Sequence, residues 1–141
     1  MDTMPPRAFK SVDLPAEVND LSGAIVDAAV AVHSRLGPGL LESAYRECLA
    51  YELRKRGHYV AQEVPMPLRY DGVILEVGYR MDLLVDDQVV LELKATDGIH
   101  PVHVAQLLTY LKLAGKPLGI LLNFHAPLMK KGIRRIANTR R

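Results

Sequence analysis

Apolar residues recur at three- and four-residue spacing in three stretches of the chain, which is the pattern of amphipathic helices. The first helix is predicted from about residue 19 to 36, where Gly37 and a proline follow. The second is predicted over residues 38–56 and ends at Gly57. A third is predicted over residues 101–114, because a proline opens it and a glycine follows it.

Shorter apolar stretches, separated by turn residues, predict strands. Pro65 and Pro67 indicate a bulge or an edge position in the first part of the sheet. The last stretch is continuously apolar, as in a strand buried on both faces, and it follows the third helix in a strand, helix, strand crossover. The predicted fold class is therefore α/β (α+β), a mixed sheet flanked by helices. The predicted strands are residues 59–64, 66–70, 73–77, 79–85, 89–95 and 118–124.

The segment 79–95 is predicted to form a hairpin whose two faces differ in chemistry. If its loop is centred on Asp87, Asp82 lies directly opposite Glu92, and side chains alternate between faces from there. The core face would carry Met81, Leu83, Val85, Val89, Leu91, Leu93 and Ala95. The other face would carry Arg80, Asp82, Leu84, Val90, Glu92 and Lys94.

The second face of the hairpin brings two acids together. Directly opposed Cβ atoms lie roughly 5 Å apart, so the carboxylates of Asp82 and Glu92 would repel each other. A hard divalent cation, Mg²⁺ or Mn²⁺, would neutralise such a pair, and Lys94 lies two residues along the same face. Alternating charged and aliphatic residues are also typical of a solvent-exposed sheet face, and the residue pattern alone leaves both interpretations open.

Two of the predicted helices offer further polar candidates. Glu42 continues the apolar stripe of the second helix and is expected to face the interior, although a first-turn acid can simply complement the helix dipole. Gln106 and Tyr110 share one side of the third helix with His103 and could position a phosphate or water, or merely form a boundary face. A zinc site at His100 and His103 is rejected because no further His or Cys cluster accompanies them.

Composition narrows the functional classes. With 141 residues and 49% hydrophobic content, the chain can build one core, expected over residues 17–136, between a loose arm at 1–16 and a basic tail at 137–141. Cys48 is the single cysteine and no apolar span approaches twenty residues, so we expect a cytoplasmic protein without internal disulfides or membrane segments.

The net charge of +2 does not by itself indicate nucleic-acid binding. The last twelve residues contain a basic run that we expect to be solvated, namely Lys130, Lys131, Arg134, Arg135, Arg140 and Arg141.

Three short motifs occur in order along the chain. Residues 39–45 fit G-x-x-E-x-x-Y, Asp82 is followed by the E-x-K of residues 92–94, and residues 106–110 fit Q-x-x-x-Y. Together they resemble the GxxExxY family of the PD-(D/E)XK nuclease superfamily, in its RecB-like and phage-exonuclease-like branch. The resemblance runs from about residue 25 to 136 and implies a restriction-endonuclease-like core. Met81 stands where the superfamily pattern has proline.

The resemblance implies metal-dependent hydrolysis of phosphodiester bonds in nucleic acid, with DNA the expected substrate. The implied metal is Mg²⁺ or Mn²⁺, held by Glu42, Asp82, Glu92 and the backbone carbonyl of Leu93. The implied catalytic residues are Glu42, Asp82, Glu92, Lys94, Gln106 and Tyr110.

Two alternatives remain open at the level of sequence. One is a catalytically inactive module that keeps the nuclease fold and binds nucleic acid or a partner protein. The other is a hydrolase that acts on a different substrate with Asp82 and Glu92 as an acid and base pair. Assembly into a homo-oligomer is possible under each interpretation.

Overall fold

A computed structural model describes residues 14–138 of the chain. Most of the predicted N-terminal arm, and the end of the predicted basic tail, lie outside these described residues. The elements are α2 (Ala16–Leu36), α3 (Glu42–Lys55), β1 (Val60–Pro65), β2 (Leu68–Tyr70), β3 (Val73–Leu75), β4 (Arg80–Val85), β5 (Val89–Lys94), α4 (Pro101–Ala114), β6 (Leu118–Asn123), η1 (Met129–Gly132) and β7 (Ile133–Ala137).

The main sheet has five strands in the order β1-β4-β5-β6-β7. Strands β5 and β6 are parallel, as the crossover through α4 predicted, and the other pairs are antiparallel. Strand β1 lies at the edge with Pro65 at its end, and every residue of β6 is buried. The predicted fold class, a mixed sheet flanked by helices, is confirmed.

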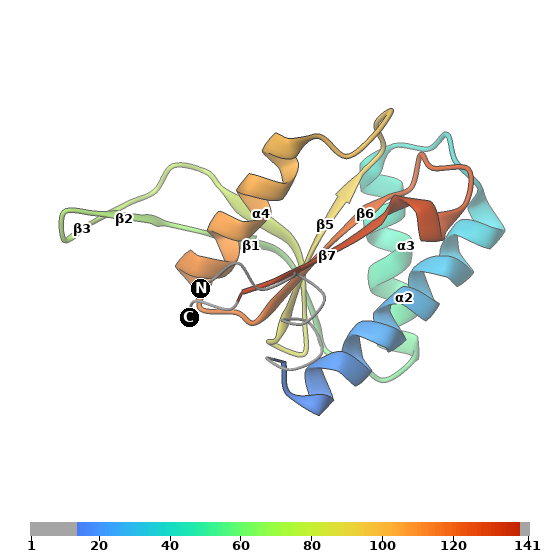
Figure 1. Cartoon of the computed structure of the whole chain (residues 1–141), viewed down its shortest axis with the longest axis horizontal. Helices are drawn as coiled ribbons and strands as arrows, with labels where there is room; N and C mark the ends of the chain where they lie inside the picture. The colour runs from blue at the N-terminus through green and yellow to red at the C-terminus, as the bar shows by residue number, and fades with distance from the viewer. Residues whose placement is uncertain (1–13, 139–141) are drawn as a thin grey trace, which may run out of the picture.

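Helices cover both faces of this sheet (Figure 1). The larger core cluster joins α2 and α3 to one face, and a smaller cluster joins α4 to the other. Helix α4 approaches closely because Gly119 of β6 has no side chain: a Cβ at Gly119 would lie 2.8 Å from Leu107. None of the helices within residues 14–138 has the length and apolar character needed to cross a membrane.

Strands β2 and β3 form a separate two-stranded sheet that projects away from the main body (Figure 1). From here on we call residues 66–80 the arm; this segment is distinct from the predicted N-terminal arm at residues 1–16. The arm leaves large apolar side chains in solvent, including Tyr70, Ile74 and Tyr79. It begins and ends beside the main sheet, because Pro65 of β1 pairs with Arg80 of β4.

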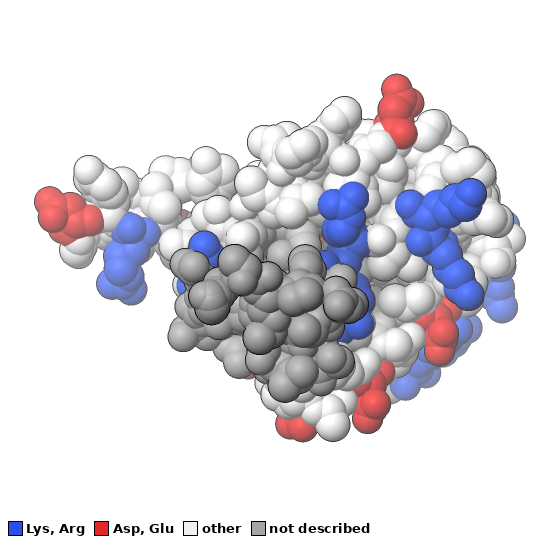
Figure 2. Space-filling model, viewed as in Figure 1, with Lys and Arg blue, Asp and Glu red and all other residues white. Residues whose placement is uncertain are grey.

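The basic run near the C-terminus contains a strand that the sequence did not predict. Strand β7 pairs with β6, and Arg135 donates a hydrogen bond from Nη2 to Asn19 Oδ1 at 3.0 Å. Figure 2 shows basic side chains over β7 and η1. The expectation of a solvated basic run was therefore wrong for Arg135, whereas Arg134 is exposed as expected; the edge of β6 supplies the backbone partners that a loose segment lacks.

The predicted hairpin register is confirmed by three pairs, from Val85 with Val89 to Leu83 with Leu91. One expectation about its faces was wrong, because Met81 belongs to the cluster beneath α4 rather than to the larger core. Of the two interpretations left open for the second face, the solvent-exposed one does not hold, since Val90 is fully buried. Both results arise because α4 covers the second face, which the hairpin pattern alone cannot reveal.

Candidate active site at the end of the hairpin

The ladder between β4 and β5 stops at Leu83 and Leu91, and side chains take over its hydrogen bonds at the next position. The backbone N–H of Asp82 donates to Glu92 Oε2 at 3.0 Å. In return, the backbone N–H of Leu93 donates to Asp82 Oδ2 at 2.8 Å. Each carboxylate is thus held against the opposite strand through one of its two oxygens. We call Asp82 and Glu92 the acid pair.

Burial makes the acid pair electrostatically unusual. Glu92 is only 6% exposed, and its burial, followed by the nearby charge of Asp82, raises its pKa to about 8. Burial also raises the pKa of Asp82, although the N–H of Leu93 opposes that shift. At neutral pH the pair therefore favours binding a proton or a cation. The alternative interpretation, a solvent-exposed sheet face, does not fit carboxylates that are buried in this way.

Glu42 reaches the same end of the sheet from another element. It is the first residue of α3, and its Oε2 accepts a hydrogen bond from the backbone N–H of Ala95 at 3.2 Å, just past the end of β5. Its side chain is exposed, so the expectation of an inward-facing carboxylate was wrong. The helix begins at this residue, so the apolar stripe that continues from it goes into the core while Glu42 stays at the rim.

Tyr45 fixes the loop that leads to Glu42. Its hydroxyl donates to the carbonyl of Gly37 and accepts from the N–H of Leu40, while its ring is fully buried and stacks on Phe124 at a centroid distance of 4.5 Å. The tyrosine of the G-x-x-E-x-x-Y motif thus has a structural role here. It ties the entry of α3 to the core and thereby sets the position of the glutamate.

Replacing Tyr45 with phenylalanine is expected to lower the free energy of unfolding by roughly 1–2 kcal/mol, because two partly buried backbone groups lose their hydrogen-bond partner. Urea denaturation followed by circular dichroism measures this change. Tyr51→Phe is the matched control, since Tyr51 lies on the same helix and is 67% exposed. Equal stability of the two variants would contradict the structural role of the Tyr45 hydroxyl.

Lys94 ends β5 next to the acid pair. Its charge lowers the pKa of both acids, against the larger effect of burial, which indicates an ammonium group near both carboxylates. The neighbouring loop is fixed by Asn123, whose Nδ2 donates to the carbonyl of Thr96 at 2.9 Å and whose Oδ1 accepts from the N–H of Thr96 at 3.2 Å. Sequence reasoning missed Asn123, although a lone amide at the end of an apolar strand was the available signal.

Helix α4 places Tyr110 close to the acid pair from the other face of the sheet. Burial raises the pKa of Tyr110, and the charge of Glu92 adds to this effect, so the phenol keeps its proton. Gln106 lies one turn earlier, and both residues line a groove of about 280 Å³ with Tyr79 of the arm. His103 takes part in the capping hydrogen bonds at the start of α4 with His100.

The donor set suits a hard divalent cation, although it does not form a complete cage. Within residues 14–138, no group of three or more His, Cys, Asp or Glu side chains is arranged to hold a metal ion. Glu42 therefore does not join the acid pair in one ready coordination shell. The pair itself offers carboxylate oxygens, which Mg²⁺ and Mn²⁺ prefer, and their closeness is the kind of repulsion that such an ion relieves.

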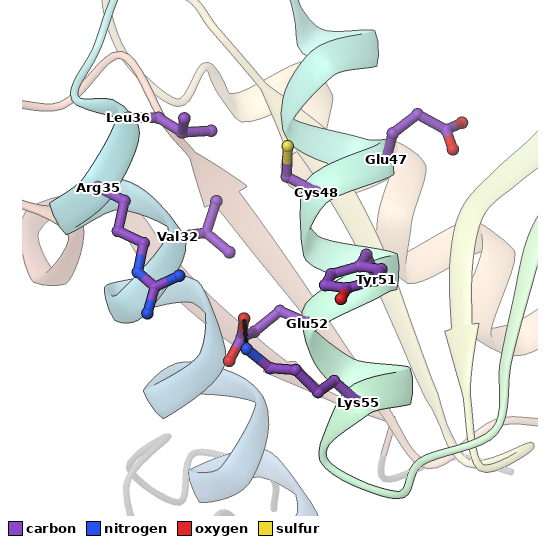
Figure 3. Close-up of a pocket in the computed structure, with 8 residues that line it drawn as sticks. All are labelled: Val32, Arg35, Leu36, Glu47, Cys48, Tyr51, Glu52 and Lys55. Atoms are coloured by element: carbon purple, nitrogen blue, oxygen red, sulfur yellow. Dashed lines mark ion pairs between the residues drawn. The ribbon is translucent and has the colours of Figure 1, made fainter.

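Another hollow, of about 330 Å³, lies between α2 and α3 (Figure 3). Its wall includes the exposed Cys48 and an ion pair between Glu52 and Lys55 with an N···O distance of 3.2 Å. None of the candidate site residues lines it. The chemistry described above is confined to the end of the hairpin.

Comparison with protein families gives one match. A family model described as the PD-(D/E)XK nuclease superfamily matches residues 19–136, which include all of the candidate site residues. Neither a curated protein nor a solved structure matches the chain.

Proposed function

Because the chain belongs to the PD-(D/E)XK nuclease superfamily, we propose that it is a metal-dependent nuclease of the GxxExxY branch that cleaves DNA in the cytoplasm. The observation that carries the proposal is the acid pair at the end of the hairpin, in which each buried carboxylate is held by a backbone N–H of the opposite strand. Such burial has a cost in stability and needs a chemical reason. Binding a cation beside a phosphodiester is a reason that suits this superfamily.

In the proposed site, Asp82 and Glu92 would hold a Mg²⁺ or Mn²⁺ ion, with the carbonyl of Leu93 as a further candidate ligand. When bound there, such an ion would supply a lowered pKa for a water molecule and positive charge beside the scissile phosphate. Glu42 stands at the rim, where it can accept a hydrogen bond from a water molecule and keep it oriented. Its bond to Ala95 N–H fixes the carboxylate beside the end of β5.

The side chain of Lys94 is a positively charged ammonium group. The two acids attract it, which places it near the reacting phosphate. As an ammonium donor, it stabilises the negative charge that develops on the phosphoryl oxygens in the transition state. It also holds the attacking water in place by hydrogen bonding. Its backbone is fixed by β6, where Lys94 pairs with Asn123 and its carbonyl accepts the N–H of Phe124 at 2.9 Å.

Helix α4 completes the proposed site. The phenol of Tyr110 keeps its proton and can donate a hydrogen bond to a phosphate oxygen, and the amide of Gln106 can donate one turn away. The groove beside them lies between α4 and the base of the arm. The substrate strand would therefore approach from the side of the sheet on which α4 lies.

The test is cleavage of single- and double-stranded DNA and RNA by the purified protein. We expect cleavage of DNA with Mg²⁺ or Mn²⁺ and no cleavage when EDTA is present in excess. Cleavage that survives complete chelation would contradict the metal-dependent mechanism and favour the acid and base pair of a different hydrolase.

A second function is kept because no three-carboxylate cage is formed among the described residues. In that case the fold would serve as an inactive module that binds nucleic acid, with the basic side chains of η1 and β7 as contacts. Salt-sensitive DNA binding without cleavage at any divalent cation concentration would favour the binding module over the nuclease.

A further inference from the structure

Helix α3 carries a second charged residue on the face that presents Glu42. Arg46 lies four residues after Glu42 and therefore on the same side of the helix. Its Nη2 lies 3.1 Å from Glu63 Oε2. Its Nε is buried and has no hydrogen-bond partner among the described residues. Part of the donor capacity of this guanidinium is thus unused inside the protein.

The charge of Arg46 acts on Asp82. Burial raises the pKa of Asp82, and among the side-chain charges that oppose this shift, Arg46 comes before Lys94. Arg46 belongs to α3, which packs on the face of the sheet opposite to α4, and sequence reasoning named only Glu42 on that helix as a site residue. A buried or half-buried cation near a phosphodiesterase site is well placed for a substrate phosphate.

Glu63, the partner of Arg46, has an unusual backbone. It lies in β1 between the paired residues Gln62 and Val64, so that it is next to Asp82 in the register of the sheet. Its φ is +50°, in the left-handed region that residues with a side chain rarely adopt within a strand. Such strain persists at sites where the surroundings hold it.

The carboxylate of Glu63 is shared between two arginines. Besides Arg46, it contacts Arg80 Nη1 at 3.4 Å, where the side chains of Arg80 and Glu63 are 60% and 46% exposed. Exposed ion pairs contribute little to stability and exchange readily. Two guanidinium groups therefore converge on one exchangeable anion at the edge of the acid pair.

We propose that Arg46 and Arg80 form a binding subsite for a backbone phosphate of the substrate strand, and that the Glu63 carboxylate occupies this subsite in the free protein. The inference rests on the proposed function, because it assigns the subsite to a nucleic-acid substrate. The planar fork of arginine matches a phosphate as well as it matches a carboxylate, so the phosphate can replace Glu63 without moving α3. Glu63 then swings toward solvent.

The test measures DNA binding in EDTA, where no cleavage takes place, by fluorescence anisotropy of a labelled duplex at several salt concentrations. Arg46→Met is expected to weaken binding about tenfold and to reduce the slope of log affinity against log salt by about 0.9, the loss of one phosphate contact. Arg54→Met is the matched control. Arg54 lies two turns further along α3 and also bonds to β1, through the carbonyl of Val60 at 2.7 Å.

Glu63→Gln separates a phosphate subsite from a merely structural ion pair. If the carboxylate competes with the substrate, this variant binds DNA more tightly than wild type, by about threefold or more. If the ion pair only holds α3 against β1, the variant binds equally or less tightly. Arg46→Lys should restore the salt slope, since it keeps the charge, but not the full affinity.

The outcomes distinguish this inference from the proposed function. Wild-type protein that binds no DNA in EDTA overturns the subsite, and it overturns the proposed function as well if it also cleaves no DNA with Mg²⁺ or Mn²⁺. Wild-type protein that binds DNA, with Arg46→Met indistinguishable from Arg54→Met in salt slope, overturns the subsite and leaves the nuclease proposal standing. A reduced slope for Arg46→Met together with tighter binding by Glu63→Gln supports the subsite, whether or not the protein cleaves DNA.

Discussion

Asp82→Asn is expected to reduce the rate of metal-dependent DNA cleavage by at least about a hundredfold, the loss that removal of one key electrostatic group commonly causes. The asparagine keeps the size of the side chain and can still accept the N–H of Leu93, which Asp82 accepts at 2.8 Å. It removes the negative charge that is proposed to hold the cation. Initial rates at saturating Mg²⁺, and again at higher Mg²⁺, would measure the loss and any rescue.

Asp87→Asn is the control for this substitution. Asp87 lies in the loop of the same hairpin, its side chain is 76% exposed, and it contacts Lys116 with an N···O distance of 2.8 Å. We expect the Asp87→Asn variant to cleave DNA at the wild-type rate. Lys94→Met should lose activity to a similar extent as Asp82→Asn. If all three variants cleaved at one common rate, the activity would come from a contaminant and the assignment of the site would fail.

The stability of the protein is expected to fall as the pH rises from about 5 to above 8. The folded-state pKa of Glu92, about 8, lies above its ordinary value of 4.5, so the fold prefers the protonated form. The unfolded chain binds fewer protons than the folded one between these two values, which makes the free energy of unfolding decrease with pH. The loss is on the order of a few kcal/mol, or roughly 5–10 °C in Tm for a chain of this length.

Glu92→Gln should remove most of this pH dependence and raise Tm at pH 8.5, because it keeps the shape and stays neutral. Mg²⁺ or Mn²⁺ should raise the Tm of wild type at pH 8.5 but have little effect near pH 5, where protons occupy the same oxygens. Differential scanning fluorimetry across this range gives both comparisons. A flat profile for wild type would mean that burial does not raise the pKa of Glu92 as described above.

The sequence specified the hairpin well because its two faces leave little freedom of register. A shift by one residue would have moved Asp82 and Glu92 into the larger core, so the loop position followed from the pattern. Helix ends were predicted wherever glycine follows, as at Gly115 after α4. The approximate start of α3 was less well predicted, since Pro38 precedes the first helical residue, Glu42, by four positions.

What could not be predicted depends on contacts between distant segments. Strand β7 was missed because Arg134 and Arg135 hide its alternation, and only the edge of β6 makes it a strand. Met81 was assigned to the wrong cluster because the position of α4 is not encoded within the hairpin. Arg46 escaped notice for the same reason, since its nearness to Asp82 depends on how α3 lies across the sheet.

The arm has a topological consequence for the site. It leaves and rejoins the main sheet at the paired residues Pro65 and Arg80, so its entire length is an excursion between two residues that face each other on neighbouring strands. Excursions of this kind can lengthen or shorten at little entropic cost, since closing a loop becomes only slowly more expensive with its length. The surroundings of the acid pair can therefore change in length and sequence while the five-stranded framework that holds the pair stays the same.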